Sequence, residues 1–426
     1  MTLLLDATHD PELKSWVESA QAPDTDFPIQ NLPFGRFSLE PDATPRIGVA
    51  IGDAVLDIVG AGLIEETDMN RLMQWPVERR KSLRRAISQG LCLGSSSRAR
   101  FSKAMCKQSA VHLHLPCKVG DYTDFYTSIE HATAVGKLFR PENPLFPNYR
   151  WVPIGYHGRA SSLIISGRNF HRPAGQHRTD PDQPPVLAPS KKLDFELELG
   201  IVIGGESSLG QGVAMADAEA HIFGLTLLND WSARDIQAWE YQPLGPFLGK
   251  NFATTLSPWL VTLDALAPFR KAFKRSEGEP QPLSYLDSAQ NSASGALDIV
   301  MEVYLQTAAM RVAGMPEERL SKAHYADAYW TPAQLVAHHT VNGCNLQSGD
   351  VFGTGTISGK GPSESGSLLE LSQGGASALR LSNGQTRTFL EDGDTIILKA
   401  YCARPGHQRI GFGECRATIL PSQCGA

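Results

Sequence analysis

Apolar and polar residues alternate in short runs along most of the chain after residue 118, a pattern typical of β-strands. The runs are SSLIISG, PPVLAPS, DFELELGIVIG, GLTLLND, SPWLVTLDAL, LDIVMEVYLQ, DTIILKAYC and RIGFGECRATIL. Few helical patterns interrupt them. One is TPAQLVAHHTVNG, where Thr331 predicts an N-cap, Pro332 the first helical residue and Gln334 a capping box. Strands this numerous predict a mixed, largely antiparallel β architecture rather than a doubly wound sheet.

The chain before residue 118 has a different pattern. Residues 46–59, RIGVAIGDAVLDIV, alternate on both sides of a Gly-Asp pair, which predicts a β-hairpin. Leu83, Ile87 and Leu91 lie four residues apart and predict one buried face of a helix. A further short helix is expected over residues 11–20.

Length and composition narrow the class of protein. A chain of 426 residues is long for one core, so we expect two domains, over residues 1–118 and 119–426. The net charge of −6 argues against a nucleic-acid partner and favours a small molecule. Seven cysteines without a CxxC pair predict reduced thiols. No apolar run approaches the length of a membrane span, so the expected location is cytoplasmic, with no membrane partner.

The segment DFELELG, residues 194–200, carries the strongest candidate chemistry. On a strand, Glu196 and Glu198 share one face about 7 Å apart, while the apolar residues face the core. The alternative is an edge strand with a solvated charged face. Asp230, at the end of HIFGLTLLND, and Asp124, in DYTDFY, supply further carboxylates. Oxygen ligands from separated strands suit Ca²⁺ or Mg²⁺, and no Cys or His cluster indicates zinc.

The densest polar stretch of the chain covers residues 229–255. If residues 231–241 are helical, Arg234, Gln237 and Tyr241 share one face, which suits a substrate with carboxylate and carbonyl oxygens. The alternative is a surface face with an incidental Asp230–Arg234 pair. The glycines before Lys250 do not have Walker spacing.

Three other segments supply candidate groups. A lone histidine is more often structural than catalytic, yet His131 lies seven residues after a candidate metal ligand and is a group that takes a proton from water near neutral pH. GYHGRASS contains Tyr156 but no G-x-S-x-G elbow, which disfavours a serine hydrolase. The glycine-rich loop 349–361 either holds a carboxylate or forms a tight turn. Glu370 is a candidate partner for a general base.

Taken together, these segments resemble the fumarylacetoacetase family of C–C bond hydrolases. The matching motifs are DYTDFYTSIEHATAVG, GYHGRASS, DFELELG, NDWSARDIQAWEYQPLGPFLGK, FATTLSPW, GTGTISG and RIGFGEC. The resemblance implies an N-terminal SH3-like β-barrel, a C-terminal mixed β-sandwich roll and a homodimer. It also implies hydrolysis of 4-fumarylacetoacetate to fumarate and acetoacetate, the last step of tyrosine and phenylalanine catabolism.

The resemblance assigns roles to residues by their position in these motifs. The ligands of a catalytic Ca²⁺ or Mg²⁺ ion would be Asp124, Glu196, Glu198 and Asp230. A second, mostly structural Mg²⁺ site would use Asp230, Lys250 and Thr254. His131 would activate water and Glu370 would orient it. The groups near the leaving carbanion would be Arg234, Gln237 and Lys250. The substrate contacts would be Tyr126, Arg140, Tyr156, Gln237, Tyr241 and Thr356.

Two other functions remain open at this point. An acylpyruvate hydrolase or a metal-dependent 2-oxo acid decarboxylase of the same superfamily uses a similar carboxylate site. The N-terminal domain, and Tyr126, Arg140 and Tyr241 as contacts for a longer dicarboxylic diketone, favour the first interpretation. An inactive metal-binding homologue is disfavoured because His131 and Glu370 are both present.

Overall fold

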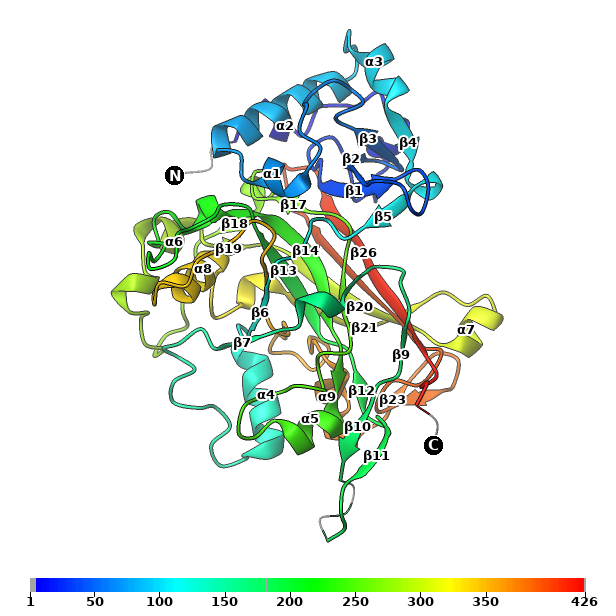
Figure 1. Ribbon diagram of the computed structural model, residues 1–426, viewed down its shortest axis with the longest axis vertical. Helices are drawn as coiled ribbons and strands as arrows, with labels where there is room; N and C mark the ends of the chain where they lie inside the picture. Colours follow the sequence, from blue (N-terminus) through cyan, green and yellow to red (C-terminus); the bar gives the residue numbers. More distant parts are fainter. Residues whose placement is uncertain (1–4, 179, 181, 425–426) are drawn as a thin grey trace.

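The structure, a computed structural model, describes residues 5–178, 180 and 182–424. Figure 1 shows a smaller N-terminal domain, blue to cyan, above a larger C-terminal one. The upper domain holds one five-stranded antiparallel sheet in the order β4-β3-β2-β1-β5. Its strands are β1 Phe34–Ser38, β2 Arg46–Ile51, β3 Ala54–Asp57, β4 Met105–Lys107 and β5 His112–His114. Its α-helices are α1 Met69–Met73, α2 Val77–Leu91 and α3 Arg98–Lys103.

The hairpin and the longer helix of this domain are confirmed. β2 and β3 pair across a turn at Gly52, whose φ of 55° suits a residue without a side chain. α2 places its three regularly spaced apolar residues in the core. The helix expected over residues 11–20 is wrong. There Ser15 Oγ and the Trp16 amide both donate to the Leu91 carbonyl, so this segment packs against the end of α2 instead of forming an α-helix, and only a short 3-10 helix, Glu18–Gln21, overlaps its end.

The C-terminal domain is built on two large sheets. The first contains β6 Tyr122–Phe125, β7 Gly155–His157, β8 Leu163–Ile165, β13 Leu197–Ile203, β14 Ile222–Asp230, β16 Thr254–Leu256, β17 Val261–Thr262 and β22 Val351–Gly353. Their order is β7-β6-β22-β13-β14-β16-β8, with β17 paired to β14. The second sheet has the order β21-β20-β25-β26-β9. Its strands are β9 Phe170–His171, β20 Val300–Gln306, β21 Glu318–His324, β25 Thr395–Cys402 and β26 Ile410–Leu420.

In the part of the chain that the structure describes, most strand pairs are antiparallel and three are parallel: β16 with β8, β22 with β6, and β26 with β9. The mixed, largely antiparallel architecture is therefore confirmed. Short pairs complete the fold: β10 Ala174–His177 with β11 Val186–Pro189, β12 Leu193–Asp194 with β15 Ser232–Ala233, β18 Arg270–Lys271 with β19 Ala296–Leu297, and β23 Leu379–Arg380 with β24 Thr386–Arg387. Within SPWLVTLDAL only Val261–Thr262 is a strand, so that prediction is mostly wrong.

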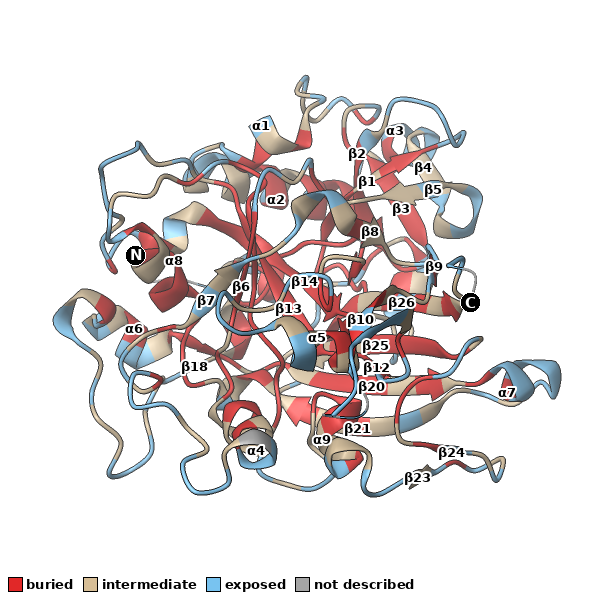
Figure 2. Cartoon of the chain, turned by 60° about the horizontal axis from the view of Figure 1, so that its bottom comes forward, coloured by how far each residue is buried: buried red, intermediate tan, exposed pale blue. Residues whose placement is uncertain are grey.

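The core of the C-terminal domain includes apolar residues of both sheets, among them Leu199 and Leu227 of the first and Val303 and Leu398 of the second. Figure 2 shows these central strands as buried. β13 lies between β14 and β22, and all of its residues are buried. The edge-strand interpretation of DFELELG is therefore wrong. The segment is also not one strand, because β12 ends at Asp194 and β13 begins at Leu197.

Six α-helices lie around these sheets among the described residues: α4 Ile129–Phe139, α5 Arg234–Glu240, α6 Ala289–Ser294, α7 Ala308–Val312, α8 Pro332–Thr340 and α9 Leu368–Leu371. α8 has the predicted N-cap, proline and capping box. α4 was not predicted, and α5 begins at Arg234 rather than at residue 231.

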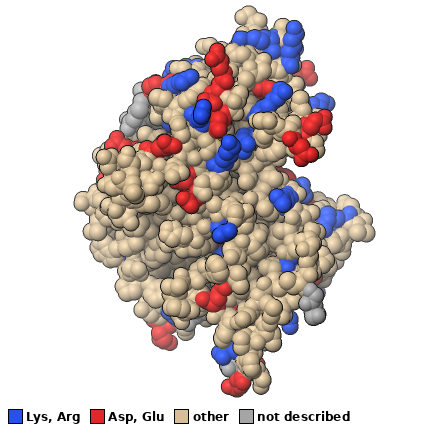
Figure 3. Space-filling view, viewed as in Figure 1, with Lys and Arg blue, Asp and Glu red and all other residues tan. Residues whose placement is uncertain are grey.

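The surface gives two further observations. Among the described residues, no helix combines the length and the apolar character needed to span a membrane. On the face in Figure 3, Lys and Arg side chains are interspersed with Asp and Glu over the N-terminal domain.

Candidate active site

A cavity of about 540 Å³ in the C-terminal domain gathers most of the predicted site residues. Its walls come from β6, α4, β7, α5 and the loop after β22. The predicted residues that line it are Asp124, Tyr126, His131, Arg140, Tyr156, Glu196, Arg234, Gln237, Tyr241, Lys250 and Thr356. The other four, Glu198, Asp230, Thr254 and Glu370, are not part of its wall. Glu198, Asp230 and Glu370 each contact a residue that is, and Thr254 donates to Asp230.

Three carboxylates form the centre of the site. Asp124, Glu198 and Asp230 are buried, and each offers an oxygen within 4.8 Å of the other two. They come from β6, β13 and β14, with β22 between the first two strands. Two of them, Asp124 and Glu198, meet over Gly353 of β22, because a Cβ there would lie 2.4 Å from Asp124 Oδ1 and 3.0 Å from Glu198 Oε2. A residue with a side chain at this position would fill the space between them.

The electrostatics of this trio favour a cation. Burial, followed by the neighbouring Asp230, raises the pKa of Asp124 well above its ordinary value. Burial, followed by Asp124 and Asp230, does the same to the pKa of Glu198. The Gly355 amide donates to both carboxylates, at 3.2 and 3.0 Å, but Glu198 Oε1 has no hydrogen-bond partner. Converging oxygens with an unpartnered buried atom fit a hard divalent ion.

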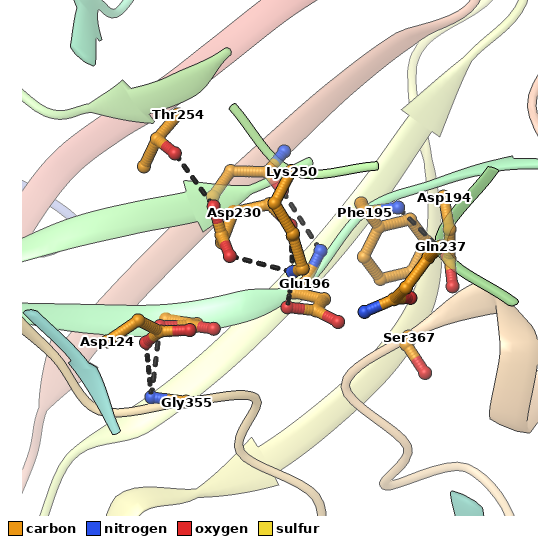
Figure 4. A network of polar contacts seen from close by, with 12 residues as sticks. Asp124, Asp194, Phe195, Glu196, Asp230, Gln237, Lys250, Thr254, Gly355 and Ser367 are labelled. Atoms are coloured by element: carbon orange, nitrogen blue, oxygen red, sulfur yellow. Dashed lines mark hydrogen bonds and ion pairs between the residues drawn. The ribbon is translucent and has the colours of Figure 1, made fainter. Parts of the chain in front are cut away.

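Glu196 lies apart from the trio and is neutralised by cations. It forms ion pairs with Lys250 and, at 2.8 Å, with Arg234 Nη1. Burial raises the pKa of Glu196, but Lys250 and Arg234 outweigh it and lower the value to about 2. Lys250 Nζ also donates to Asp230 Oδ2 at 2.7 Å, and Thr254 Oγ1 donates to Asp230 Oδ1 at 2.7 Å. Figure 4 shows Lys250 between Asp230 and Glu196.

His131 stands on α4 against a carboxylate from a distant part of the chain. Ser128 caps α4 and accepts a hydrogen bond from the His131 amide. His131 Nδ1 lies 2.7 Å from Glu370 Oε2, which also accepts hydrogen bonds from Ser358 Oγ at 3.0 Å and Ser367 Oγ at 2.7 Å. His131 lines the cavity while Glu370 engages its Nδ1. This is the geometry of a general base with an orienting carboxylate.

One face of α5 contributes polar groups to the cavity. Arg234, Gln237 and Tyr241 all line it, and Arg234 Nη1 donates to Gln237 Oε1 at 3.2 Å. The acidic partners of Arg234 are Asp194 and Glu196, so the alternative of an incidental Asp230–Arg234 pair is wrong.

The remaining predicted contacts lie around the same cavity. The Arg140 guanidinium lies 4.1 Å from the centre of the Phe146 ring, and its buried Nε has no hydrogen-bond partner. Tyr126 packs edge to face on His131, with ring centres 5.6 Å apart. Tyr156 donates to Asp230 Oδ2 at 3.1 Å, which ties this wall of the cavity to the carboxylate trio.

Comparison with protein families decides the identity of this arrangement. The family described as "Fumarylacetoacetate (FAA) hydrolase C-terminal" matches residues 122–420, and "Fumarylacetoacetase N-terminal" matches residues 30–116. The chain belongs to the fumarylacetoacetase family.

Relatives in this family are similar over nearly their whole length. The chain is 45% identical over 420 residues to the fumarylacetoacetase of Rattus norvegicus, covering 94% of this chain and 98% of the relative. It is also 45% identical over 430 residues to that of Arabidopsis thaliana, covering 96% and 99%.

Solved structures share the fold at low identity. A fumarylacetoacetate hydrolase from Exiguobacterium antarcticum is 15% identical, with a TM-score of 0.50 over 92% of this chain and 99% of that one. A putative HpcE protein from Mycobacterium smegmatis is 18% identical, with a TM-score of 0.51 over 91% and 99%.

For this member of the fumarylacetoacetase family, sequence patterns missed several residues of the site. Asp194 was part of a recognised motif but received no role, although it binds Arg234. Ser358 and Ser367 were not singled out, although both bind Glu370. The spacing of Ile129, Ala132 and Val135 behind a serine was the signal that could have revealed α4.

The pH dependence of stability should reveal the charge on Glu370. Burial raises its pKa, but His131 and the serine hydroxyls outweigh burial and lower it. Because the folded-state pKa is the lower one, the stabilisation is complete above the ordinary glutamate pKa of about 4.3 and is lost as the pH falls through the folded value. Urea unfolding should therefore show that Glu370→Gln lowers the free energy of unfolding at about pH 7 and that the difference from wild type shrinks below about pH 4. If the difference in the free energy of unfolding between Glu370→Gln and wild type did not change with pH, Glu370 would not be ionised in the folded protein.

Proposed function

We propose that this chain hydrolyses the C–C bond of 4-fumarylacetoacetate and releases fumarate and acetoacetate, the last step of tyrosine and phenylalanine catabolism. The observation that carries the proposal is the juxtaposition, at one cavity, of the His131–Glu370 pair and the carboxylate trio. The names of the relatives, each similar over almost the whole chain, support this substrate.

The cavity offers groups that suit a dicarboxylic diketone. Arg140, with an unpartnered Nε, would bind one carboxylate, and Tyr126 and Tyr241 would donate hydrogen bonds to oxygens. Tyr156, whose hydroxyl donates to Asp230, would contact the substrate without donating to it. Gln237 and Thr356 would contact the same substrate from α5 and from the loop after β22. The apolar wall, which includes Val135, Phe146 and Ile154, would cover its carbon chain.

The reaction begins with water placed beside His131. His131 Nε2 takes a proton from water while Glu370 holds Nδ1, and the resulting hydroxide adds to the carbonyl carbon next to the bond to be broken. The tetrahedral intermediate re-forms the carbonyl as the carboxylic acid product and expels the other fragment with the bonding electron pair. That fragment leaves as an enolate, and Lys250, Arg234 and Gln237 lie where their donors would stabilise its charge. One proton, equivalent to the one that His131 took from water, is then delivered to the enolate carbon, which gives acetoacetate and returns His131 to its neutral form.

We assign Asp124, Glu198 and Asp230 as ligands of a divalent cation, Ca²⁺ or Mg²⁺, with Glu196 as a fourth ligand. The trio supports this assignment directly, whereas Glu196 would have to share its oxygens with Lys250 and Arg234. When bound, the cation would act as a Lewis acid on the carbonyl groups of the substrate. For the second Mg²⁺ site, Lys250 and Thr254 would contribute beside Asp230. A protonated ammonium repels a cation, so Lys250 would have to offer its carbonyl oxygen.

The domain boundary, the oligomeric state and the cellular location follow from features outside the cavity. We place the domain boundary near residue 118, between β5 and β6, and interpret the five-stranded first sheet as an SH3-like barrel beside a β-sandwich roll. We propose a homodimer, for which the largely exposed Leu244 and Phe247 supply apolar surface. A cytoplasmic location is supported by seven free cysteines.

A turnover assay tests the function. Enzyme stripped with a chelator and then given Ca²⁺ or Mg²⁺ is offered fumarylacetoacetate and a panel of acylpyruvates. We expect fumarate and acetoacetate only with metal, and faster than cleavage of any acylpyruvate. Preference for acylpyruvates, or decarboxylation of 2-oxo acids, would move the chain to another branch of the superfamily. Metal binding without turnover of any diketone would indicate an inactive homologue.

A further inference from the structure

Asp194 is a fully buried carboxylate that the proposed reaction does not use. It lies at the end of β12, whose pairing with β15 brings it beside the start of α5. In Figure 4 it lies on the opposite side of Glu196 and Gln237 from Asp124. Its side chain is fully buried and is not part of the cavity wall.

One set of contacts of Asp194 fixes the cation of α5. Arg234 Nε donates to Asp194 Oδ2 at 2.9 Å, and Nη2 lies 2.8 Å from the same oxygen in an ion pair. With these groups held by Asp194, Nη1 is turned toward Glu196 and Gln237 at the cavity. A guanidinium gripped along one edge keeps one orientation, because its donors form a rigid planar fork.

The other set of contacts fixes the turn that carries Glu370. The amides of Leu368 and Leu369 donate to Asp194 Oδ1 and Oδ2, at 2.7 and 3.0 Å. These are the first two amides of α9, which have no partner within the helix. Ser367 caps the next amide and binds the Glu370 carboxylate. One carboxylate therefore joins two segments that lie far apart in the sequence.

We propose that Asp194 is a positioning residue, which sets the Arg234 guanidinium and the Glu370–His131 pair in fixed relation to each other across the cavity. The inference rests on the proposed function, because it assigns these two groups to opposite steps of one reaction: activation of water and departure of the enolate. Displacement of either group by about 1 Å is enough to lower the rate by about 10²-fold.

Asp194→Asn keeps the shape of the side chain but cannot accept from both amides and from Arg234 together. We expect kcat to fall by about 10²-fold and KM to change by less than about 5-fold, since Arg140 and Tyr126 are untouched. When Asp194→Asn is added to Glu370→Gln or to Arg234→Lys, kcat should fall by less than about 10-fold further, because one of the groups that Asp194 positions is already impaired. Equal losses in all three backgrounds would overturn the proposal.

A proton NMR measurement makes the test independent of substrate. The Nδ1 proton of His131 bonded to Glu370 should give a downfield resonance, assigned by its loss in Glu370→Gln. We expect this resonance to shift in Asp194→Asn. If Asp194→Asn fails to fold, Arg234→Lys takes its place, because the loss of the guanidinium should move Asp194 and through it the His131 resonance. An unchanged resonance in the variant measured would overturn the proposal. If the wild type does not cleave fumarylacetoacetate while the resonance shifts, the proposed function fails and the positioning role stands.

Asp394→Asn is the matched control. Asp394 is also buried, pairs with Arg387 through bonds of 2.8 and 3.0 Å, and accepts from the Glu391 amide. It lies outside the cavity wall. The control should be less stable than wild type. The position of its His131 resonance should be unchanged, and its kcat should stay within about 3-fold of wild type. If it matched Asp194→Asn in both readouts, general loosening of the fold would explain the effect and the proposal would be wrong.

Discussion

Glu198→Gln is expected to abolish metal-dependent turnover while making the metal-free protein more stable. Three buried carboxylates converge, and burial followed by Asp124 and Asp230 raises the pKa of Glu198 well above its ordinary value. When no cation is present, a buried acid with a raised pKa lowers the stability of the fold at neutral pH, and a neutral amide avoids that cost, but the amide also removes an anionic ligand. Loss of several kcal/mol of Lewis-acid stabilisation corresponds to a fall in kcat of at least about 10³-fold.

Two measurements check this prediction on the same samples. Calorimetric titration with Ca²⁺ and Mg²⁺ should show that the variant binds at least about 10²-fold more weakly, and thermal unfolding with chelator should show a higher Tm than wild type. Glu302→Gln is the control, because Glu302 is buried but bonds to Arg319 and Tyr304 outside the trio. Unchanged affinity in Glu198→Gln would remove the trio from metal binding, and a lower Tm would show that its charges do not repel.

Sequence patterns reveal those parts of this protein that local chemistry determines. The hairpin β2–β3 follows from alternation around Gly52, and α8 follows from Thr331, Pro332 and Gln334, because each signal acts within a few residues. The alternation of apolar and acidic residues in DFELELG also placed Glu198 correctly near Asp124 and Asp230.

The rest depends on tertiary contacts that no local pattern contains. Glu196 and Glu198 look equivalent in the sequence. In the structure, however, β12 ends at Asp194 and β13 begins at Leu197, and Glu196 forms ion pairs with Lys250 and Arg234. α4 contains a threonine and a glycine that weaken its helical pattern, and its support comes from packing. The pairing of His131 with Glu370, and the central position of Asp194, depend on segments far apart in the chain.

The alternation of negative and positive side chains across the site has a physical cause. Like charges can share a buried site only if cations or hydrogen-bond donors separate them. Across this site the trio is followed by Lys250, then Glu196, then Arg234, then Asp194, so that negative and positive groups alternate from the candidate metal centre to α9. Substitution of one member therefore changes the partners of its neighbours, which is why each test above is paired with a control outside the site.

His131→Ala is expected to lower kcat by at least about 10²-fold without weakening metal binding. His131 lines the cavity, and its Nδ1 is held by the carboxylate of Glu370. Ser358 and Ser367 fix that carboxylate through their own hydrogen bonds. His131 is not part of the carboxylate trio, so the affinity for Ca²⁺ or Mg²⁺ should stay within about 3-fold of wild type. Steady-state turnover and calorimetric titration of the same preparation measure the two quantities.

The control for this substitution is His339→Ala. His339 lies 3.0 Å from Thr123 of β6 and stacks on Phe352, so its removal leaves a comparable gap near the same strand, but it does not line the cavity. Added imidazole should partly restore turnover to His131→Ala, because the gap is open to the cavity, and should have no effect on His339→Ala. Near-wild-type turnover in His131→Ala would exclude the histidine as the base. A loss without imidazole rescue but with weakened metal binding would mean that His131 supports the carboxylate site instead of activating water.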